Sequence, residues 1–142
     1  MIEIDVTRDL EACHLLRRIV FIEEQGVSEA DELDDLDDGA IHLLARDQGR
    51  PVASARLLLQ GEVGKIGRVC VLKEMRGTGL GQLLMLKALE ELSRLPEITT
   101  AKLGAQCHAL GFYEKLGFTA FGPIYDDAGI PHRDMKIVLK KA

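Results

Sequence analysis

The segment from Arg76 to Gly81 has the composition of an anion-binding loop at the start of a helix. It consists of Arg76, Gly77, Thr78, Gly79, Leu80 and Gly81. A glycine within a helix costs about 1 kcal/mol relative to alanine, so helix stability does not explain this run. Glycines leave the N–H groups of a helix N-terminus bare, and the helix dipole there attracts anions. Because Arg76 adds a positive charge, the segment predicts a diphosphate-binding site.

Two common phosphate-binding patterns do not fit these glycines. The phosphate loop of nucleotide hydrolases requires a Lys followed by Ser or Thr after its last glycine, and neither pair occurs here. The dinucleotide pattern G-x-G-x-x-G fits at Gly77 and Gly79 but has Gln82 in place of its third glycine. The pattern that does fit is Arg-x-x-Gly-x-Gly, at Arg76, Gly79 and Gly81.

Strands and helices on either side must hold this loop at the end of a buried strand. Residues 68–72 alternate as a strand with one buried face, and apolar residues at helical spacing predict a helix from the glycines to about Leu95. The other expected strands span residues 2–6, 40–46, 52–59, 99–103, 118–124 and 132–139, and the other expected helices span residues 10–25 and 106–116. Residues 27–39 are expected to contain one short helix or none. This order predicts a single α/β (α+β) domain over residues 1–142 with a mixed sheet.

A second motif follows the strand expected at residues 99–103. It has the form Ala-x-x-Phe-Tyr-x-x-x-Gly-Phe and lies at Ala109, Phe112, Tyr113, Gly117 and Phe118. Together with Arg-x-x-Gly-x-Gly, it resembles the two signatures of the GNAT superfamily of acyl-CoA-dependent N-acetyltransferases. Residues 21–27 and 129–132 further resemble a small bacterial branch often called ElaA-like. The resemblance covers nearly the whole chain, and it implies a GNAT-like three-layer domain whose central mixed, mostly antiparallel sheet is flanked by helices.

The resemblance implies that the chain binds coenzyme A and uses acetyl-CoA as its acyl donor. The implied coenzyme-binding residues are Val69, Cys70, Val71, Arg76, Gly77, Thr78, Gly79, Leu80, Gly81, Gln106 and Tyr113. The implied catalytic groups are the Val71 N–H, which would polarise the thioester carbonyl, and Tyr113, which would protonate the leaving thiolate. Gln106 stands where the family usually has Asn, but its amide can form the same hydrogen bonds. The alternatives are a core position for Val71 and an aromatic ring packed on Phe112 for Tyr113.

The acceptor side is less determined by the sequence. Nine acidic residues and no Lys or Arg lie between Glu23 and Asp38, which leaves 14 acidic and 18 basic residues elsewhere. This acidic run predicts attraction of a cationic amine. Glu23, Glu24 and Asp37 are candidates for substrate binding or for the general base, with a solvated acidic loop as the alternative. His132 would orient the acceptor or relay a proton, and a histidine of a turn or an edge strand is the alternative.

Composition excludes several other classes of protein. A net charge of −5 without a basic patch argues against nucleic-acid binding. No apolar run reaches the ~18 residues of a membrane span, and the N-terminus lacks a signal peptide, so a cytoplasmic location is expected. The three cysteines, Cys13, Cys70 and Cys107, have no paired spacing, which predicts reduced thiols and no metal site.

The sequence therefore predicts a cytoplasmic acyl-CoA-dependent N-acyltransferase. Its substrate would be a primary amine of a small molecule, which attacks the thioester directly in a ternary complex. A non-catalytic module that binds or senses acyl-CoA is one alternative, and a protein N-acetyltransferase is another. A homodimer is compatible with the sequence.

Overall fold

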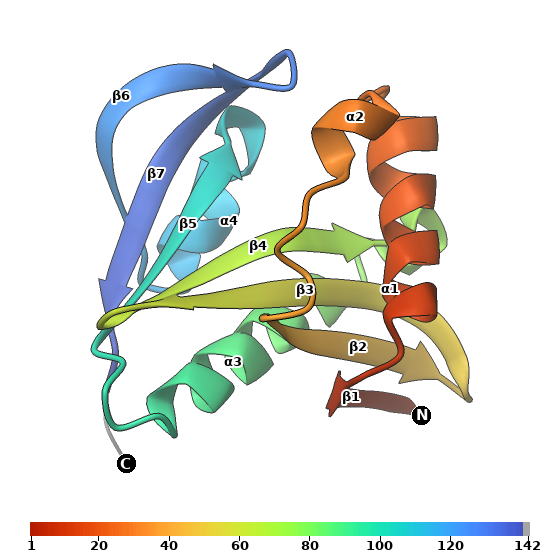
Figure 1. The fold of residues 1–142 in the computed structure, drawn as a ribbon, viewed down its shortest axis with the longest axis horizontal. Helices are drawn as coiled ribbons and strands as arrows, with labels where there is room; N and C mark the ends of the chain where they lie inside the picture. The colour runs from red at the N-terminus through yellow and green to blue at the C-terminus, as the bar shows by residue number, and fades with distance from the viewer. Residues whose placement is uncertain (141–142) are drawn as a thin grey trace.

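Apolar residues that alternate along the chain produce seven strands, which form one sheet in the computed structural model of residues 1–140 (Figure 1). The strands are β1 (Ile2–Thr7), β2 (Ile41–Asp47), β3 (Arg50–Gln60), β4 (Val63–Val71), β5 (Thr100–Gln106), β6 (Thr119–Asp127) and β7 (Ile130–Val138). Their order in the sheet is β1-β2-β3-β4-β5-β7-β6, and only the β4–β5 pair is parallel. The predicted mixed, mostly antiparallel sheet is confirmed.

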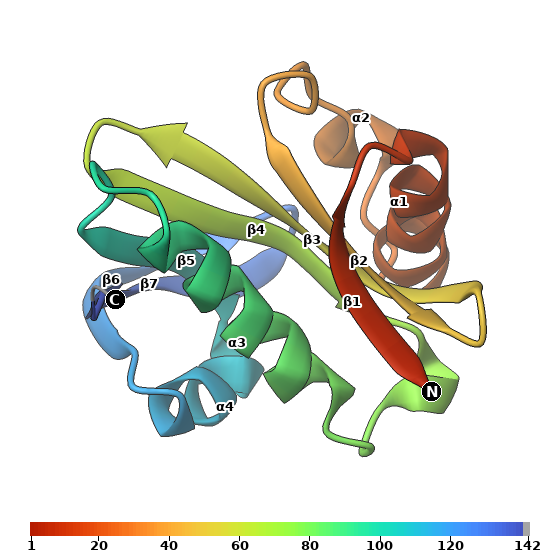
Figure 2. The ribbon, with the colours of Figure 1, turned by 90° about the horizontal axis from the view of Figure 1, so that it is seen from below.

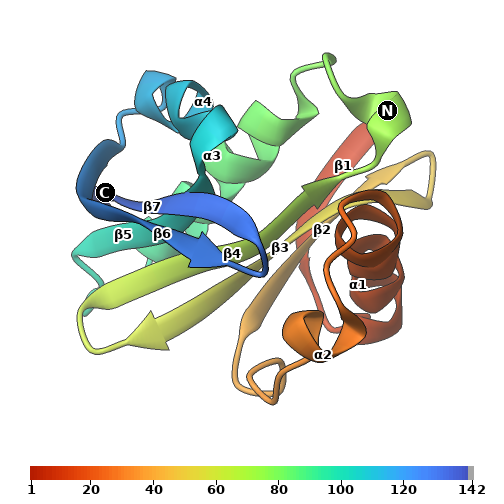
Figure 3. The ribbon, with the colours of Figure 1, turned by 90° about the horizontal axis from the view of Figure 1, so that it is seen from above.

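Helices cover both faces of this sheet. They are α1 (Leu10–Arg17), the π-helix η1 (Arg18–Glu24), α2 (Glu29–Glu32), the 3-10 helix η2 (Lys73–Met75), α3 (Leu80–Ser93), the 3-10 helix η3 (Cys107–Ala109) and α4 (Leu110–Lys115). α1 and α2 lie on one face, and α3 and α4 lie on the other (Figures 2 and 3). The predicted three-layer arrangement is therefore confirmed. None of the helices within residues 1–140 is long and apolar enough to cross a membrane.

The helix predicted over residues 10–25 changes its winding halfway. Asp9 caps its N-terminus through a side-chain hydrogen bond. From Arg18 onward the winding is π-helical, and the N–H of Gln25 donates to the carbonyl of Val20 at 3.0 Å. Gly26 then ends the helix with a φ of 73°. Helices of this kind are rare and concentrate at functional sites, and the last turn of η1 lines the cavity described below.

α3 packs tightly against the centre of the sheet, which fixes the position of its N-terminus. Its buried stripe consists of Leu80, Leu84, Met85, Ala88 and Leu92. Gly64 on β4 allows this close approach, because a Cβ at that position would lie 2.4 Å from the Leu92 side chain. The glycine-rich loop between η2 and α3 is consequently held beside the C-terminal end of β4, as the sequence predicts.

β4 and β5 are neighbours over a short distance only. Their parallel pairing joins residues 63–65 to residues 100–102, and beyond Lys65 the two strands separate (Figure 1). Past this point β4 carries a bulge, where its register against β3 shifts and Arg68 adopts a φ of 50°. The separation opens a gap between the two parts of the sheet.

The C-terminal strands are longer than expected and differ in their placement. β6 extends to Asp127 and β7 begins at Ile130, so only two residues form the turn between them. Because β7 lies between β5 and β6, His132 is on an inner strand and only 8% exposed. The alternative of a turn or edge-strand histidine is therefore wrong.

Candidate active site

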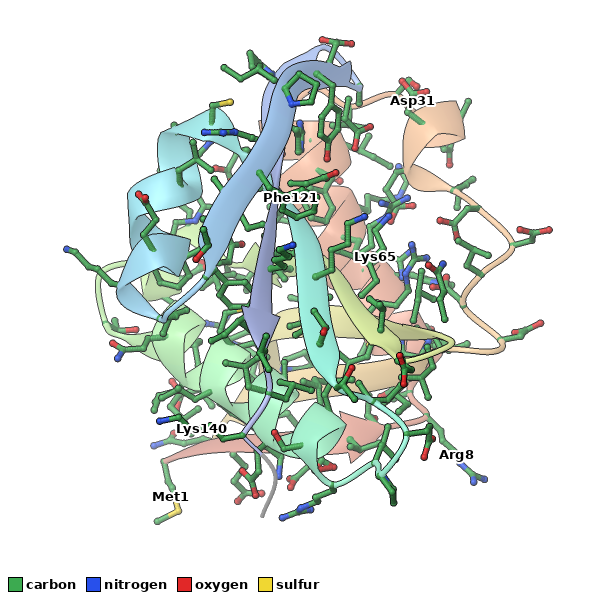
Figure 4. The ribbon with its side chains drawn as sticks, turned by 90° about the vertical axis from the view of Figure 1, so that its left-hand side faces the viewer. Met1, Arg8, Asp31, Lys65, Phe121 and Lys140 are labelled. Atoms are coloured by element: carbon green, nitrogen blue, oxygen red, sulfur yellow. The ribbon has the colours of Figure 1, made fainter. Side chains whose placement is uncertain are left out.

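A cavity of about 980 Å³ lies where β4 and β5 separate. Of the residues predicted from the sequence, it is lined by Glu24, Val69, Cys70, Val71, Arg76, Gly81, Gln106, Tyr113 and His132. Glu23 is exposed and does not line it. Figure 4 shows the molecule from the side of β6 and β7, with labels on Phe121 of β6, Lys65 of β4 and Asp31 of α2. The fold thus brings together residues from both sequence motifs and from the end of η1.

The glycine-rich loop has the form of a diphosphate cradle. Gly79 is the N-cap of α3, with a φ of 87° and no capping side-chain hydrogen bond. A Cβ added at Gly77 or Gly79 would meet no protein atom within 4 Å, so the space above both glycines is open. The N–H of Leu80 approaches the Thr78 hydroxyl at 3.4 Å, and a helix end of this kind leaves further N–H groups for a ligand. These residues fit a diphosphate.

Arg76 has two partners within the protein. Its guanidinium forms a two-pronged ion pair with Glu24 from the end of η1, in which Nη2 lies 2.8 Å from Oε1. The same group donates to the carbonyl oxygen of Val71 at 3.0 and 3.1 Å. Hydrogen bonding from Arg76 lowers the pKa of Glu24. Glu24 is therefore an ionised partner of Arg76 and poorly suited to accept a proton.

Changing Glu24 to Gln is expected to strengthen coenzyme A binding by up to about fivefold, the value of an exposed ion pair. The change removes a negative charge beside the predicted diphosphate site and releases Arg76 to contact the phosphates. Calorimetric titration with coenzyme A measures the effect. Glu23→Gln is the matched control, because the neighbouring carboxylate lies outside the cavity and should leave affinity unchanged. Weaker binding in Glu24→Gln would instead show that Glu24 holds Arg76 in its binding position.

The backbone of Val71 is directed into the gap between β4 and β5. The next N–H, that of Leu72, donates to Val52 on β3 at 2.9 Å. Backbone groups alternate in direction along an antiparallel pair, so the Val71 N–H and C=O point away from β3. The side chains of Val69 and Val71 pack against the core. At Val71 the side chain therefore packs against the core while the backbone N–H is directed away from β3.

Cys70 is a core residue. It is 2% exposed, pairs with Ser54 on β3, and its sulfur lies 3.3 Å from the Ser54 hydroxyl. Burial raises the pKa of this thiol to about 11, so it stays protonated at neutral pH. Cys70 is therefore a buried cysteine of β4.

Tyr113 extends from α4 to the cavity with a neutral hydroxyl. Its ring packs edge-on against Phe112 at 5.0 Å and Phe118 at 6.1 Å between centroids. Burial raises the pKa of Tyr113 to about 12. Within residues 1–140 its hydroxyl has no hydrogen-bond partner, so it can donate to a ligand. The packed-aromatic interpretation holds for the ring and does not conflict with a role for the hydroxyl.

Gln106 joins elements that are distant in sequence. Its side-chain N–H donates to Gln25 at 3.1 Å, and its oxygen lies 2.6 Å from Nε2 of His108. An amide oxygen only accepts, so His108 is the donor in the second contact. Gln106 thereby connects the end of η1 to the end of β5 at the cavity wall.

The acidic run is largely neutralised by arginines. Five of its nine carboxylates form ion pairs, and the pairs are Glu24–Arg76, Glu29–Arg18, Glu32–Arg17, Asp34 with Arg56 and Arg68, and Asp37 with Arg17 and Arg56. Arg17 and Arg56 are only 2% and 4% exposed. The acidic run therefore forms a wall of the cavity that ion pairs with arginines hold in place. This pairing removes most of the physical basis for attraction of a cationic amine.

This arginine cluster also excludes Asp37 as the general base. Burial alone would raise its pKa, but hydrogen bonds from Arg17 and His14 outweigh that effect and lower the pKa of Asp37 far below its ordinary value. Arg17 and Arg56 were not predicted as parts of the site. The available signal was an arginine next to an apolar residue that the fold buries, Leu16 before Arg17 and Leu57 after Arg56.

The chain resembles known acyltransferases in sequence and in fold. Residues 20–139 match the family model described as an acetyltransferase (GNAT) domain. The chain is 40% identical over 127 residues to YyaT of Bacillus subtilis, covering 87% of this chain and 85% of YyaT. The crystal structure of an acyl-CoA N-acyltransferase from Pseudomonas aeruginosa superimposes with a TM-score of 0.86 at 32% identity, over 96% of this chain and 99% of that one. The chain belongs to the GNAT acetyltransferase family.

Its place within the family follows from a further relative. ElaA of Escherichia coli is 38% identical over 124 residues, which are 84% of this chain and 81% of ElaA. The crystal structure of that ElaA superimposes with a TM-score of 0.81, over 96% of this chain and 99% of that one. The protein is a member of the ElaA-like branch, as residues 21–27 and 129–132 predicted.

Proposed function

We propose that this protein is an acetyl-CoA-dependent N-acetyltransferase that acetylates a primary amine of a small molecule. The amine attacks directly while donor and acceptor are both bound. One observation carries the proposal: the uncapped start of α3, the backbone of Val71 and the hydroxyl of Tyr113 border the same gap between β4 and β5. The similarity to an acyl-CoA N-acyltransferase supports the use of an acyl-CoA donor.

Each group has a separate role in this proposal. When bound, acetyl-CoA supplies an acyl group activated as a thioester. The N–H groups at the start of α3 hold the diphosphate, and the Val71 N–H donates to the thioester carbonyl oxygen as negative charge develops there. Tyr113 donates a hydrogen bond to the departing sulfur. With the Tyr113 pKa at about 12, complete proton transfer to a thiolate is uphill, so hydrogen bonding in place is its main contribution.

Two glycine substitutions test the diphosphate cradle. Gly79 and Gly49 have nearly the same backbone, with φ of 87° and 86°, and both have open space around an added Cβ. Alanine at either position costs about 1–2 kcal/mol in backbone strain. We expect Gly79→Ala and Gly49→Ala to lose similar stability in urea unfolding. Only Gly79→Ala should also weaken coenzyme A binding, by about tenfold, because its methyl group covers the N–H groups of the loop.

Thiol release from acetyl-CoA in the presence of an amine panel tests the reaction itself. The panel contains small primary amines and lysine-containing peptides, and the acetylated product is identified by mass spectrometry. Amine-dependent release with a small molecule supports the proposal. Binding of acetyl-CoA without release from any amine would favour a sensing module, and release with peptides alone would favour a protein N-acetyltransferase.

A further inference from the structure

The ring of His132 is held in one tautomer. Its Nδ1 lies 2.7 Å from the carbonyl oxygen of Ile130, two residues earlier on β7. A carbonyl oxygen only accepts, so Nδ1 carries the proton of the neutral ring. The remaining ring nitrogen, Nε2, then carries the unshared lone pair of the ring. Within residues 1–140 no group occupies this nitrogen, and His132 lines the cavity together with Tyr113 and Val71.

Neighbouring residues fix the orientation of this ring. The Tyr125 ring stacks on it with 5.9 Å between centroids and 25° between planes. Tyr125 is held in turn by a 2.8 Å hydrogen bond from its hydroxyl to Asp134. Gly104 provides the space, because a Cβ there would lie 2.4 Å from the Tyr125 hydroxyl oxygen. β5, β6 and β7 together therefore position an imidazole with an unshared electron pair at the cavity wall.

Most other titratable groups around the cavity are already engaged in a hydrogen bond or an ion pair. Asp31 and Asp127 also line it, but both are exposed, and no side-chain hydrogen bond within residues 1–140 orients either carboxylate. The groups that face His132 are Tyr125, Asp134, Asp127 and, across β5, His108 beside Gln106. Burial and the hydrogen bond to Asp134 raise the pKa of Tyr125, so its phenol stays protonated. Asp134 accepts from that phenol, and His108 Nε2 donates to Gln106. Glu24 and Asp37 are committed to arginines.

We propose that Nε2 of His132 is the general base that takes the proton from the acceptor amine. This inference rests on the proposed function. As the amine nitrogen bonds to the carbonyl carbon and the C–S bond breaks, the proton lost by nitrogen goes to Nε2, while the hydrogen bond from Tyr113 stabilises the departing thiolate. His132 then releases its proton to solvent, and the thiolate takes one from solvent. Atoms and charge balance without any further reactant.

His132→Gln tests this role, with His108→Gln as the matched control in the same cavity. His132→Gln is expected to lower kcat by about 100-fold, in the range for loss of a general base. The affinity for coenzyme A should not change, and the acidic limb of the kcat/KM profile should disappear. The deficit should shrink with an acceptor amine that is already neutral at pH 7. His108→Gln should retain the wild-type pH profile.

The ring tautomer gives a readout that does not depend on activity. Nitrogen-15 chemical shifts of the neutral His132 ring in the free protein should show protonated Nδ1 and unprotonated Nε2. The opposite tautomer would overturn the inference. Unimpaired turnover of His132→Gln beside an active wild type would overturn it as well, while leaving the proposed function intact. A wild type that releases no thiol with any amine would overturn both.

Discussion

Tyr113→Phe is expected to lower kcat by about 100-fold and to leave the affinity for coenzyme A unchanged. The change removes only a hydroxyl, which has no partner within residues 1–140 and faces the cavity. In the proposed function, ground-state binding of coenzyme A depends on the start of α3 and the edge of β4, and neither is altered. Stability should also stay the same, because the packing of the ring on Phe112 and Phe118 is retained. Steady-state thiol release gives kcat, and calorimetry gives the affinity.

The leaving group provides the control for this prediction. A thioester whose thiol is more acidic than coenzyme A needs less help as it departs, so the deficit of Tyr113→Phe should become smaller. An unchanged kcat, or a loss of the same size with every thioester, would show that the hydroxyl does not act on the departing sulfur.

Arg17→Met is expected to lower the free energy of unfolding by about 3–5 kcal/mol, the cost of breaking a buried ion pair. The Arg17 side chain is 2% exposed and bonds to Glu32 at 2.6 Å and to Asp37 at 3.0 Å. Its removal leaves these two carboxylates, with 6% and 12% exposure, without their main cation. Arg18→Met is the control, because its pair with Glu29 is exposed and worth less than about 1 kcal/mol. Urea unfolding at pH 7 measures both.

The pH dependence gives a second measurement on the same variant. The folded-state pKa values of Asp34 and Asp37 lie below the ordinary value of about 4. The unfolded chain therefore binds more protons in acid, so the stability from these pairs is present above about pH 5 and is lost as pH falls toward the folded-state pKa values. The stability of Arg17→Met should fall less steeply as pH decreases, because Asp37 is less strongly paired in this variant. Equal slopes of unfolding free energy against pH in the wild type and in Arg17→Met would contradict a lowered Asp37 pKa caused by pairing with Arg17.

Local patterns predicted the parts of the site that lie close together in sequence. The glycine spacing located the start of α3, and the second motif located Tyr113, because each depends on a single turn or helix. The ion pairs of Arg17 and Arg56 could not be predicted. Their carboxylate partners lie 15 to 22 residues away along an irregular loop, so nothing in the pattern sets their register.

The placement of His132 shows a second limit. Adjacent hairpin strands suggest that the last strand lies at an edge, whereas β7 is inserted between β5 and β6. That insertion depends on pairing between β5 and a strand that begins 24 residues after β5 ends, at Ile130. Only the tertiary structure places Tyr125 and Asp134 around the imidazole and turns an ordinary histidine into an oriented one.

The short parallel contact between β4 and β5 also affects how the molecule responds to force and heat. Strands β1–β4 and strands β5–β7–β6 are joined in the sheet by pairing at three positions of each strand. A molecule seated in the gap contacts both halves and takes the place of the missing strand-to-strand contacts. Ligand that binds only the folded chain adds about 2.7 kcal/mol of stability at a concentration of 100 times its Kd. Bound donor would thus hold the two halves of the sheet together, and the protein would be most resistant to unfolding with the donor bound.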